Sequence, residues 1–338
     1  MSQLAQPEQV VRCPRCTKPF RVPQAPATTS ALPKAVELGG GASVPDAATH
    51  KAPAPVTPEL FSERFTPPAA INRAALRDSA EPAAFAWLAI CACVPALAAI
   101  LMALVPSLLN PCMLALPLMC GAPLVAAFFA LYIAECLVLA HIKCNAIEVT
   151  AHQCPEIHAI AHSFAQRLRE PLPTIYVMQD STFNALAVML AGKRVLVLHS
   201  AAIDSILLKG SMTQLGFLVG HELGHHYAGH LTLWHRTIAL LGSWFIWVRL
   251  WHSRRCEFTA DRYGLVCAGE LTASLRAMCN MLAGAQLANA VDVGEAVEQW
   301  RRHRGEFFVG AQTLESTHPP TLARIEALVR AGHELGVA

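Results

Sequence analysis

Charged residues are scarce in this chain of 338 residues. Asp, Glu, Lys and Arg together make up only 15% of the sequence, whereas hydrophobic residues make up 54%. Such a ratio is unusual for a soluble protein and directs attention to membrane segments. The net charge is only +2 and no long basic run occurs, so the sequence gives no electrostatic support for nucleic-acid binding.

A disulfide framework and a secretory signal are also missing from the pattern. The first residues are polar, so we expect no signal peptide. Of the 12 cysteines, several, among them Cys91, Cys120 and Cys136, lie within apolar segments. We therefore interpret most cysteines as small buried hydrophobes in a reducing compartment.

The longest stretch without charge lies between Glu81 and Glu135. A helix needs about 20 residues to cross a bilayer, so this stretch is long enough for two crossings. We predict two transmembrane helices within residues 81–141, near 84–106 and 112–140. A buried helical hairpin in a soluble core is the alternative, which the length and the missing charge disfavour.

Basic residues flank this stretch but do not occur in the turn within it. Arg64, Arg73 and Arg77 precede the first span, and Lys143 follows the second. By the positive-inside rule, both flanks are expected in the cytoplasm. The N-terminus and the large C-terminal region then share that side.

The composition divides the chain into four segments. These are a polar head with half a zinc-ribbon motif (1–24), a Pro- and Ala-rich disordered linker (25–80), the two membrane helices (81–141) and a catalytic domain (142–338). We expect this last domain to be mainly α-helical with a small β-sheet. Its expected elements are a helix over 155–170, strands over 174–178, 185–190 and 194–199, and a helix beginning near Ser211.

The helix that begins near Ser211 carries the pattern His-Glu-x-x-His at His221, Glu222 and His225. Histidines four residues apart lie on one helical face, so both imidazoles can bind the same zinc ion. Glu222 can reach a metal-bound water without ligating the metal, and can act as general base and then general acid in peptide hydrolysis. The alternative is a histidine-rich amphipathic helix without a metal.

A pair of acidic residues follows at the same helical spacing. Two histidines and one glutamate leave a fourth zinc position open, so we expect Glu257 to be the third ligand. We expect Asp261 to accept the free N–H of a ligating histidine. His226 and His230 repeat the spacing on another face without a glutamate after them, and we interpret them as solvated or packing residues.

These motifs resemble the gluzincin family of zinc metallopeptidases that includes HtpX and the type I CAAX prenyl protease. Four segments carry the resemblance in the family's order: Phe183–Ala187, Gly220–His225, Glu257–Asp261 and Ser316–Pro320. The resemblance covers roughly residues 145 to 332. It implies a zincin-like fold, one catalytic Zn²⁺, and endopeptidase activity on membrane or misfolded proteins, in the bacterial inner membrane.

The resemblance also implies roles for two further segments. Asn184 and Ala185 would belong to an edge strand that pairs with the substrate backbone, with a simple hairpin strand as the alternative. His318 would approach the zinc as a catalytic residue that stabilises the oxyanion or blocks the open site. The alternative for His318 is a helix-entry residue before Pro319.

HtpX-like proteins can have two further membrane spans after the zinc motif, and here the pattern differs. The apolar run over residues 237–250 is short and is accompanied by tryptophans. These features favour a position at the membrane interface over a crossing, with a buried core helix as the alternative.

Cys13 and Cys16 form a candidate second metal site, because Cys-Pro-Arg-Cys resembles the first half of a zinc ribbon. A ribbon needs four ligands and no second Cys-x-x-Cys follows, so we do not expect a bound ion there. A degenerate remnant, a site completed by another chain and a redox-labile pair remain open.

The sequence as a whole predicts a membrane-anchored zinc endopeptidase. Its expected partners are protein or peptide substrates and the lipid bilayer, and no nucleic acid. The alternative is a non-proteolytic membrane adaptor that recruits partners through the cysteine head and the linker. The intact Glu222 argues against it, because an adaptor does not need a general base.

Overall fold

The computed structural model describes residues 10–12, 19–21, 71–109, 115–181 and 184–337. Contacts divide the chain into two units, Met1–Lys51 and Ala52–Ala338. In the first unit, β1 (Val10–Arg12) and β2 (Pro19–Arg21) pair in antiparallel fashion. Cys13 and Cys16 lie outside the described residues, so their interpretation stays a prediction.

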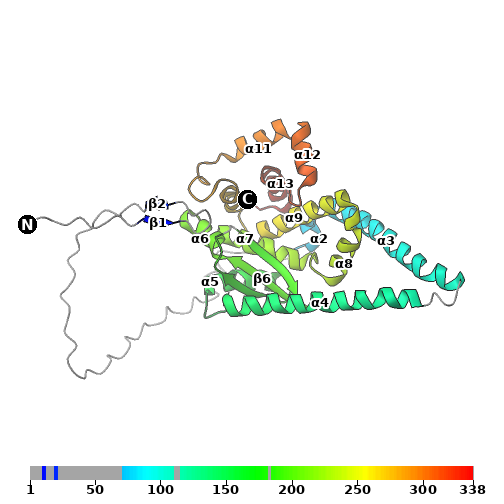
Figure 1. Ribbon diagram of the computed structural model, residues 1–338. Coiled ribbons are helices and arrows are strands. Elements are labelled where there is room, and N and C mark those ends of the chain that lie inside the picture. The colour runs from blue at the N-terminus through cyan, green and yellow to red at the C-terminus, as the bar shows by residue number, and fades with distance from the viewer. Residues whose placement is uncertain (1–9, 13–18, 22–70, 110–114, 182–183, 338) are drawn as a thin grey trace, which may run out of the picture. The chain divides into compact units, whose positions relative to one another are not determined.

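The second unit is mainly helical with one small sheet, which confirms the predicted fold class (Figure 1). Its strands are β3 (Ile147–Glu148), β4 (Thr174–Met178), β5 (Ala185–Leu190) and β6 (Lys193–His199). The helices of the first half are α2 (Arg73–Leu76), α3 (Glu81–Leu109), α4 (Ala115–Asn145), α5 (Pro155–Leu168), α6 (Ser200–Lys209) and α7 (Met212–Tyr227). They are followed by α8 (Leu233–Leu241), the 3₁₀ turn η2 (Gly242–Trp244), α9 (Ile246–Ala268), α10 (Leu271–Ala283), α11 (Val293–His303), α12 (Phe307–Glu315) and α13 (Thr321–Leu335).

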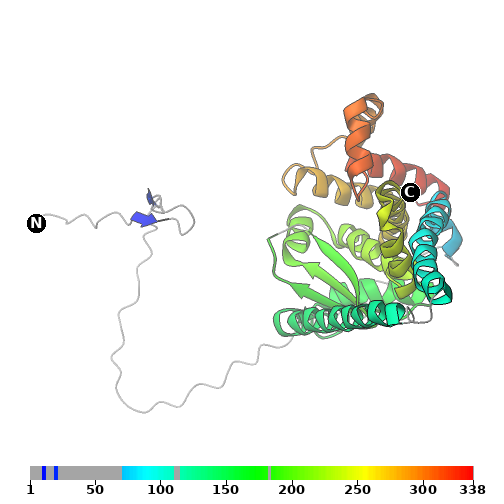
Figure 2. The same ribbon diagram turned by 45° about the vertical axis from the view of Figure 1, so that its right-hand side comes forward.

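The sheet has the order β3-β4-β6-β5, in which only β4 and β6 are parallel. Side chains alternate across β6, as a strand with both faces covered requires. Val195 and Val197 pack with Leu139 of α4, whereas Leu196 and Leu198 belong to the main core with α5 and α7. The sheet therefore lies between α4 on one face and α5 and α7 on the other, and α7 carries the zinc motif (Figure 2).

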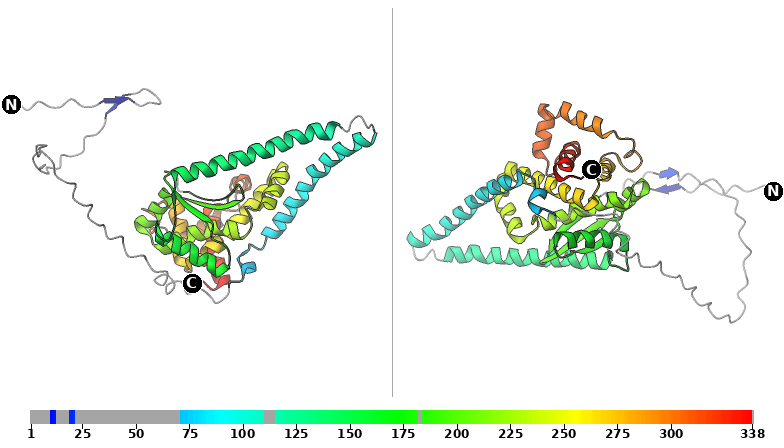
Figure 3. Two further views of the ribbon diagram at one scale, coloured as in Figure 1. Left: turned by 90° about the horizontal axis from the view of Figure 1, so that it is seen from below. Right: turned by 180° about the vertical axis from the view of Figure 1, so that it is seen from behind.

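The helices α3 and α4 are long and apolar, and most of their described side chains stay exposed. Two segments are long and apolar enough to cross a membrane, Glu81–Met102 and Val125–Asn145. The two helices leave the rest of the unit at separate places and approach each other at their far ends (Figure 3). Helix α4 extends beyond the predicted limit of residue 141 because its last turns pack on the sheet.

The predicted linker over residues 25–80 is wrong at its C-terminal end, because residues 71–80 are part of the fold. Asn72 caps α2 by accepting a hydrogen bond from the Ala74 N–H, and Leu76 is only 1% exposed in the main core. Arg73 and Arg77 donate hydrogen bonds to carbonyl oxygens at the end of α7. A single turn held mainly by such distant contacts has no periodicity that a sequence could show.

The close pairing of α7 and α9 holds the zinc motif in place. Ser211 caps α7 by accepting a hydrogen bond from the Gln214 N–H, as the sequence suggested. The helices touch at Gly220, where an added Cβ would lie 2.2 Å from the Cβ of Cys267. On the other side, a second core joins α7 and α9 to α10 and α13.

The apolar run over residues 237–250 does not form one helix. It is divided between α8, η2 and the start of α9, and Trp244 and Trp247 are half exposed. Among the described residues, only α3 and α4 contain segments that qualify as membrane spans. The exposed tryptophans support the interfacial interpretation, although Ile238 and Leu250 are buried.

Candidate metal centre

Three predicted ligands from two helices converge at one point. The Nε2 atom of His221 lies 3.6 Å from Oε2 of Glu257, and the Nε2 atom of His225 lies 3.5 Å from Oε1. Their potential donor atoms all lie within 4.8 Å of one another. His221 and Glu257 are each 7% exposed.

This arrangement fits a zinc ion. Bonds of about 2.0–2.2 Å in a tetrahedral site separate neighbouring ligand atoms by about 3.4 Å. The two measured nitrogen–oxygen distances, 3.6 and 3.5 Å, are close to that value. Two imidazoles and one carboxylate also leave a position for a further ligand, as a catalytic zinc site requires.

A buried ion-pair network holds His221 from behind. Oδ1 of Asp261 lies 3.0 Å from Nδ1 of His221, so the ring donates through Nδ1 and directs Nε2 toward the other ligands. Arg324 donates to both oxygens of Asp261, at 2.9 and 2.6 Å, and also lies 3.6 Å from Glu257. A buried carboxylate between an arginine and a histidine is held in its ionised form.

The second predicted ligand, His225, has partners that the sequence analysis missed. Its Nδ1 lies 3.0 Å from Nδ1 of His230, whose Nε2 lies 3.3 Å from Oε1 of Glu81. His230 is 7% exposed and Glu81 is fully buried, so of the two interpretations of His230, solvated or packing, the solvated one is wrong. A series of hydrogen-bonded side chains therefore connects Glu81, the first residue of α3, to the predicted ligand His225.

The sequence contains only weak signs of this connection between Glu81, His230 and His225. Glu81 is the last charged residue before the apolar stretch, and a buried carboxylate there needs a partner. Gly229 has a φ of +86°, which turns the backbone after α7 and returns His230 toward His225. His226 is also buried, with Nε2 3.0 Å from the Val195 carbonyl oxygen, so it packs α7 on the sheet.

The protonation states of the central residues follow from burial and neighbouring charge. Burial, with the charge of Glu257, raises the pKa of Glu222 above its usual value. Burial, followed by the neighbouring His221 and His230, holds the pKa of His225 well below its usual value, so the ring is neutral and one of its nitrogens keeps a free lone pair. Burial lowers the pKa of His221, but the hydrogen bond and charge of Asp261 outweigh it and raise the pKa overall.

The two segments expected near the site lie beside it. Strand β5 is at the edge of the sheet, and its Ala187 N–H donates to Oε2 of Glu222 at 2.8 Å. Asn184 precedes this strand and accepts a hydrogen bond from the Ala185 N–H. The exposed His318 lies before α13, with its Nε2 atom 3.6 Å from Oε1 of Glu257.

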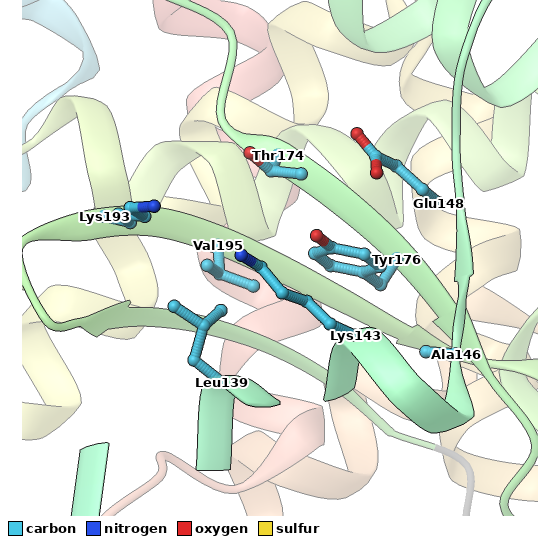
Figure 4. A pocket seen from close by; sticks show the side chains of 8 residues that line it. All are labelled: Leu139, Lys143, Ala146, Glu148, Thr174, Tyr176, Lys193 and Val195. Carbon is cyan, nitrogen blue, oxygen red and sulfur yellow. The ribbon is translucent and has the colours of Figure 1, made fainter. Parts of the chain in front are cut away.

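A separate pocket of about 450 Å³ lies between the end of α4 and the outer face of the sheet (Figure 4). Its lining includes Lys143, Lys193, Glu148 and Tyr176. None of the residues that line it belongs to the metal centre, which lies on the opposite side of the sheet with α7. The pocket therefore does not extend the metal site.

Known proteins resemble the chain over the region that forms the metal centre. The sequence model of Peptidase family M48 matches residues 151–248 and 234–331. A "Protease HtpX homolog" of Thermococcus kodakarensis is 26% identical over 238 residues, 57% of this chain and 79% of the relative. "Plastoglobule-localized metallopeptidase 48, chloroplastic" of Arabidopsis thaliana is 24% identical over 207 residues, 53% of this chain and 58% of the relative.

A second "Protease HtpX homolog", from Thermodesulfovibrio yellowstonii, is 33% identical over 98 residues, 29% of this chain and 33% of the relative. No solved structure matches the chain. The segments matched by the family model together cover more than half of the chain and include the His-Glu-x-x-His helix and Glu257. The chain therefore belongs to peptidase family M48, the gluzincin family of HtpX and the type I CAAX prenyl protease, and is a membrane-associated metalloprotease.

Proposed function

We propose that this metalloprotease is a zinc endopeptidase that hydrolyses peptide bonds of membrane or misfolded proteins. One observation carries the proposal: His221 and His225 direct their Nε2 atoms toward the two carboxylate oxygens of Glu257, with Glu222 buried next to them. His221, His225 and Glu257 would hold one zinc ion. When bound, zinc supplies a Lewis acid that polarises a carbonyl group and makes water a nucleophile near neutral pH.

Glu222 moves the proton in this proposal. Its carboxylate takes a proton from the attacking water and passes it to the leaving amine. The raised pKa of Glu222 favours holding that proton between the two steps, and the N–H of Ala187 fixes the position of the carboxylate. Asp261 keeps His221 in the tautomer that ligates through Nε2.

The substrate backbone binds at the free edge of β5 in this proposal. Among the strands that the structure describes, β5 pairs only with β6, and the Ala187 N–H points from the other edge to the general base. An extended peptide added beside Asn184 and Ala185 would run past Glu222. His318, exposed and close to Glu257, either stabilises the developing oxyanion or covers the open metal position.

The membrane position of the site is part of the same proposal. Both flanks of the α3–α4 pair carry the basic residues, so we place the catalytic domain and the N-terminus in the cytoplasm, at the bacterial inner membrane. Reporter fusions after Thr66 and at Ala338 should both give a cytoplasmic signal. A signal from the opposite side at either position contradicts this topology.

The decisive experiment combines metal analysis with cleavage of a casein-type substrate by the purified full-length protein. We expect Glu222→Gln to keep its zinc but to lose activity by at least about 100-fold, because a general base is removed while the ligands remain. We expect His221→Ala to lose both zinc and activity. His226→Gln, on the same helix, is the matched control and should keep its zinc.

Two results contradict the proposal. If Glu222→Gln loses its zinc as completely as His221→Ala does, Glu222 is a ligand. Cleavage by Glu222→Gln at the rate of the unchanged protein would remove Glu222 from the reaction.

A further inference from the structure

His221, His225 and Glu257 form the catalytic trio. A second group of side chains with nitrogen and sulfur donor atoms lies close to this trio but takes no part in the proposed reaction. His252 and Cys256 are four residues apart on α9 and therefore share one face of that helix. His235 comes from α8. Cys256 precedes the ligand Glu257 in the sequence, so its side chain is rotated about 100° around the helix from that ligand.

The donor atoms of this group lie close enough together to hold one metal ion. Sγ of Cys256 lies 3.5 Å from Nε2 of His252, and the rings of His252 and His235 have their centroids 4.8 Å apart. The potential donor atoms of the three side chains lie within 4.8 Å of one another. Zinc bonds of about 2.3 Å to sulfur and 2.0–2.1 Å to nitrogen separate those two atoms by about 3.6 Å, near the distance found for Cys256 and His252.

Burial makes these polar groups expensive without a ligand. His252 is 4% exposed and Cys256 is 6% exposed. Within the part of the chain that the structure describes, the ring of His252 has only the sulfur of Cys256 as a hydrogen-bond partner, and a thiol is a weak one. A buried imidazole with so little compensation destabilises the fold, and a metal bond would offset that cost.

Both histidines are in the form that binds metals. Burial is the main cause that lowers the pKa of His252 to about 4, and the neighbouring His230 adds to it. Burial and the charge of His252 lower the pKa of His235 to about 3. At neutral pH both rings are therefore uncharged and have a free lone pair.

A competing set shares Cys256 with this group. Glu81, His230 and Cys256 also lie close together. Glu81, however, already accepts hydrogen bonds from Arg77 and Thr259 and contacts His230, and His230 also contacts His225. These groups have their partners, so they need no ion.

We propose that His235, His252 and Cys256 form a second metal site, which binds Zn²⁺ and is distinct from the catalytic trio. One thiolate and two imidazoles favour a soft or borderline cation over Mg²⁺ or Ca²⁺. On binding, the thiol of Cys256 becomes a thiolate and its proton goes to solvent. No oxidation step is involved.

The site would join α3, which together with α4 forms the membrane arm, to α9, the helix that carries Glu257. Phe85 of α3 stacks on His235 with ring centroids 4.7 Å apart and contacts His252 at 5.6 Å. An ion held by His235 of α8 and two residues of α9 would fix both rings against α3. The role is therefore structural: it sets how α3 meets the helix that carries Glu257.

Cobalt substitution tests the site without measuring activity. The catalytic trio contains no sulfur, so a thiolate-to-cobalt absorption band in Co²⁺-loaded full-length protein must come from a cysteine ligand. The protein should carry Cys13→Ser and Cys16→Ser, so that this pair does not contribute. We expect the band to be lost in Cys256→Ser and kept in Cys267→Ser, which removes another buried thiol of the same helix.

Zinc content provides the second measurement. We expect Cys256→Ser to hold one zinc ion fewer per chain than its parent, and His221→Ala to lose a different one, so that the losses add. If Cys256→Ser does not fold, the half-buried His235→Gln should give the same loss. The proposal is overturned if no sulfur–cobalt band forms, if both cysteine variants lose it equally, or if neither Cys256→Ser nor His235→Gln lowers the zinc content.

Discussion

Around α7 and α9 the protein buries charged side chains, whereas along α3 and α4 it exposes large apolar ones. Glu222, Asp261 and Arg324 are 7%, 2% and 5% exposed, respectively. Trp87 and Phe128, on the two long helices, are 56% and 61% exposed. Buried charges and exposed apolar side chains would each destabilise an ordinary soluble protein. This protein tolerates the two for different reasons.

The buried charges are stable because they have partners. Arg324 lies between two carboxylates, and Asp261 between an arginine and a histidine. Removing one member leaves a buried charge without compensation, which typically destabilises by about 3–5 kcal/mol. The exposed apolar residues need no partner if lipid surrounds them, because hydrocarbon solvates them as well as a protein core does.

The two regions meet at Glu81. This residue begins α3, yet its carboxylate is fully buried and contacts His230 and Thr259. The membrane arm therefore begins inside the polar network of the catalytic domain. We therefore expect large losses of activity or stability where a partner of a buried group is removed, and smaller losses elsewhere.

The largest effect is expected at Glu257, the proposed third metal ligand. Glu257→Ala removes one of three protein ligands, so zinc should bind much more weakly and activity should fall by at least about 1,000-fold. Asp261→Asn removes a partner of His221 instead, and such changes typically lower metal affinity or activity about 10–100-fold. Metal titration and cleavage rates measure both.

Glu270→Ala is the matched control, because this glutamate follows α9 and lies outside the trio. It should keep full zinc content. If Glu270→Ala loses zinc while Glu257→Ala keeps it, the third ligand has been assigned to the wrong residue.

A charge in the membrane arm should have the next largest effect. Val94 lies in the span Glu81–Met102 and is 53% exposed. Val94→Arg at such a position should weaken membrane insertion by about 3 kcal/mol. Extraction of membranes at high pH should release more of this variant than of Val94→Leu. Equal extraction of the two would mean that this face of α3 is not in contact with lipid.

The sequence predicted what depends on local spacing. The apolar helices, the strands and the His-Glu-x-x-His motif can each be recognised within a short stretch of sequence. Residue spacing and composition were therefore enough to predict them. Glu257 was predicted as the third ligand because it shares a helical spacing with Asp261 and because of the family resemblance, and the structure places it beside His221 and His225.

The parts that were missed depend on contacts between distant residues. His230 and Glu81 are far apart in the sequence, and only the fold brings them together. The same is true of α2, whose single turn is held by contacts with the end of α7. His235 and Cys256 come from different helices, and nothing in the spacing of either residue indicates the other.

Helix packing behind the metal centre should be sensitive to a single methyl group. A Cβ on Gly220 would lie 2.2 Å from Cβ of Cys267 and 3.0 Å from the Cα of Gly264. Gly220→Ala should therefore destabilise by about 1–3 kcal/mol, even though alanine favours a helix by about 1 kcal/mol. Gly310 lies in α12, where an added Cβ would meet no described atom within 4 Å outside the backbone of its own helix, so Gly310→Ala should instead be neutral or stabilising. A lower melting temperature for Gly310→Ala than for Gly220→Ala would contradict this packing.

The smallest expected effect is a pH dependence of stability that arises at His226. Burial lowers the pKa of this histidine to about 4, although its hydrogen bond with the Val195 carbonyl oxygen partly opposes the shift. In the unfolded chain its pKa is about 6.5, so between about pH 6.5 and pH 4 the unfolded state binds a proton that the folded state does not. The contribution of His226 is therefore complete above about pH 6.5 and is lost as the pH falls toward 4. Over the range from about pH 7 to about pH 5 the loss should be on the order of 1 kcal/mol.

Other buried groups change stability in the same direction, because the pKa values of His252 and His235 are also lowered, chiefly by burial. His226→Gln isolates one contribution, since glutamine does not titrate and can still donate to the Val195 carbonyl oxygen. Melting temperatures of the metal-free protein should fall from about pH 7 to about pH 5, and should fall less steeply in His226→Gln. Parallel curves for the two proteins would show that His226 takes up its proton in the folded state as readily as in the unfolded chain, and that burial between α7 and the sheet does not exclude its charge.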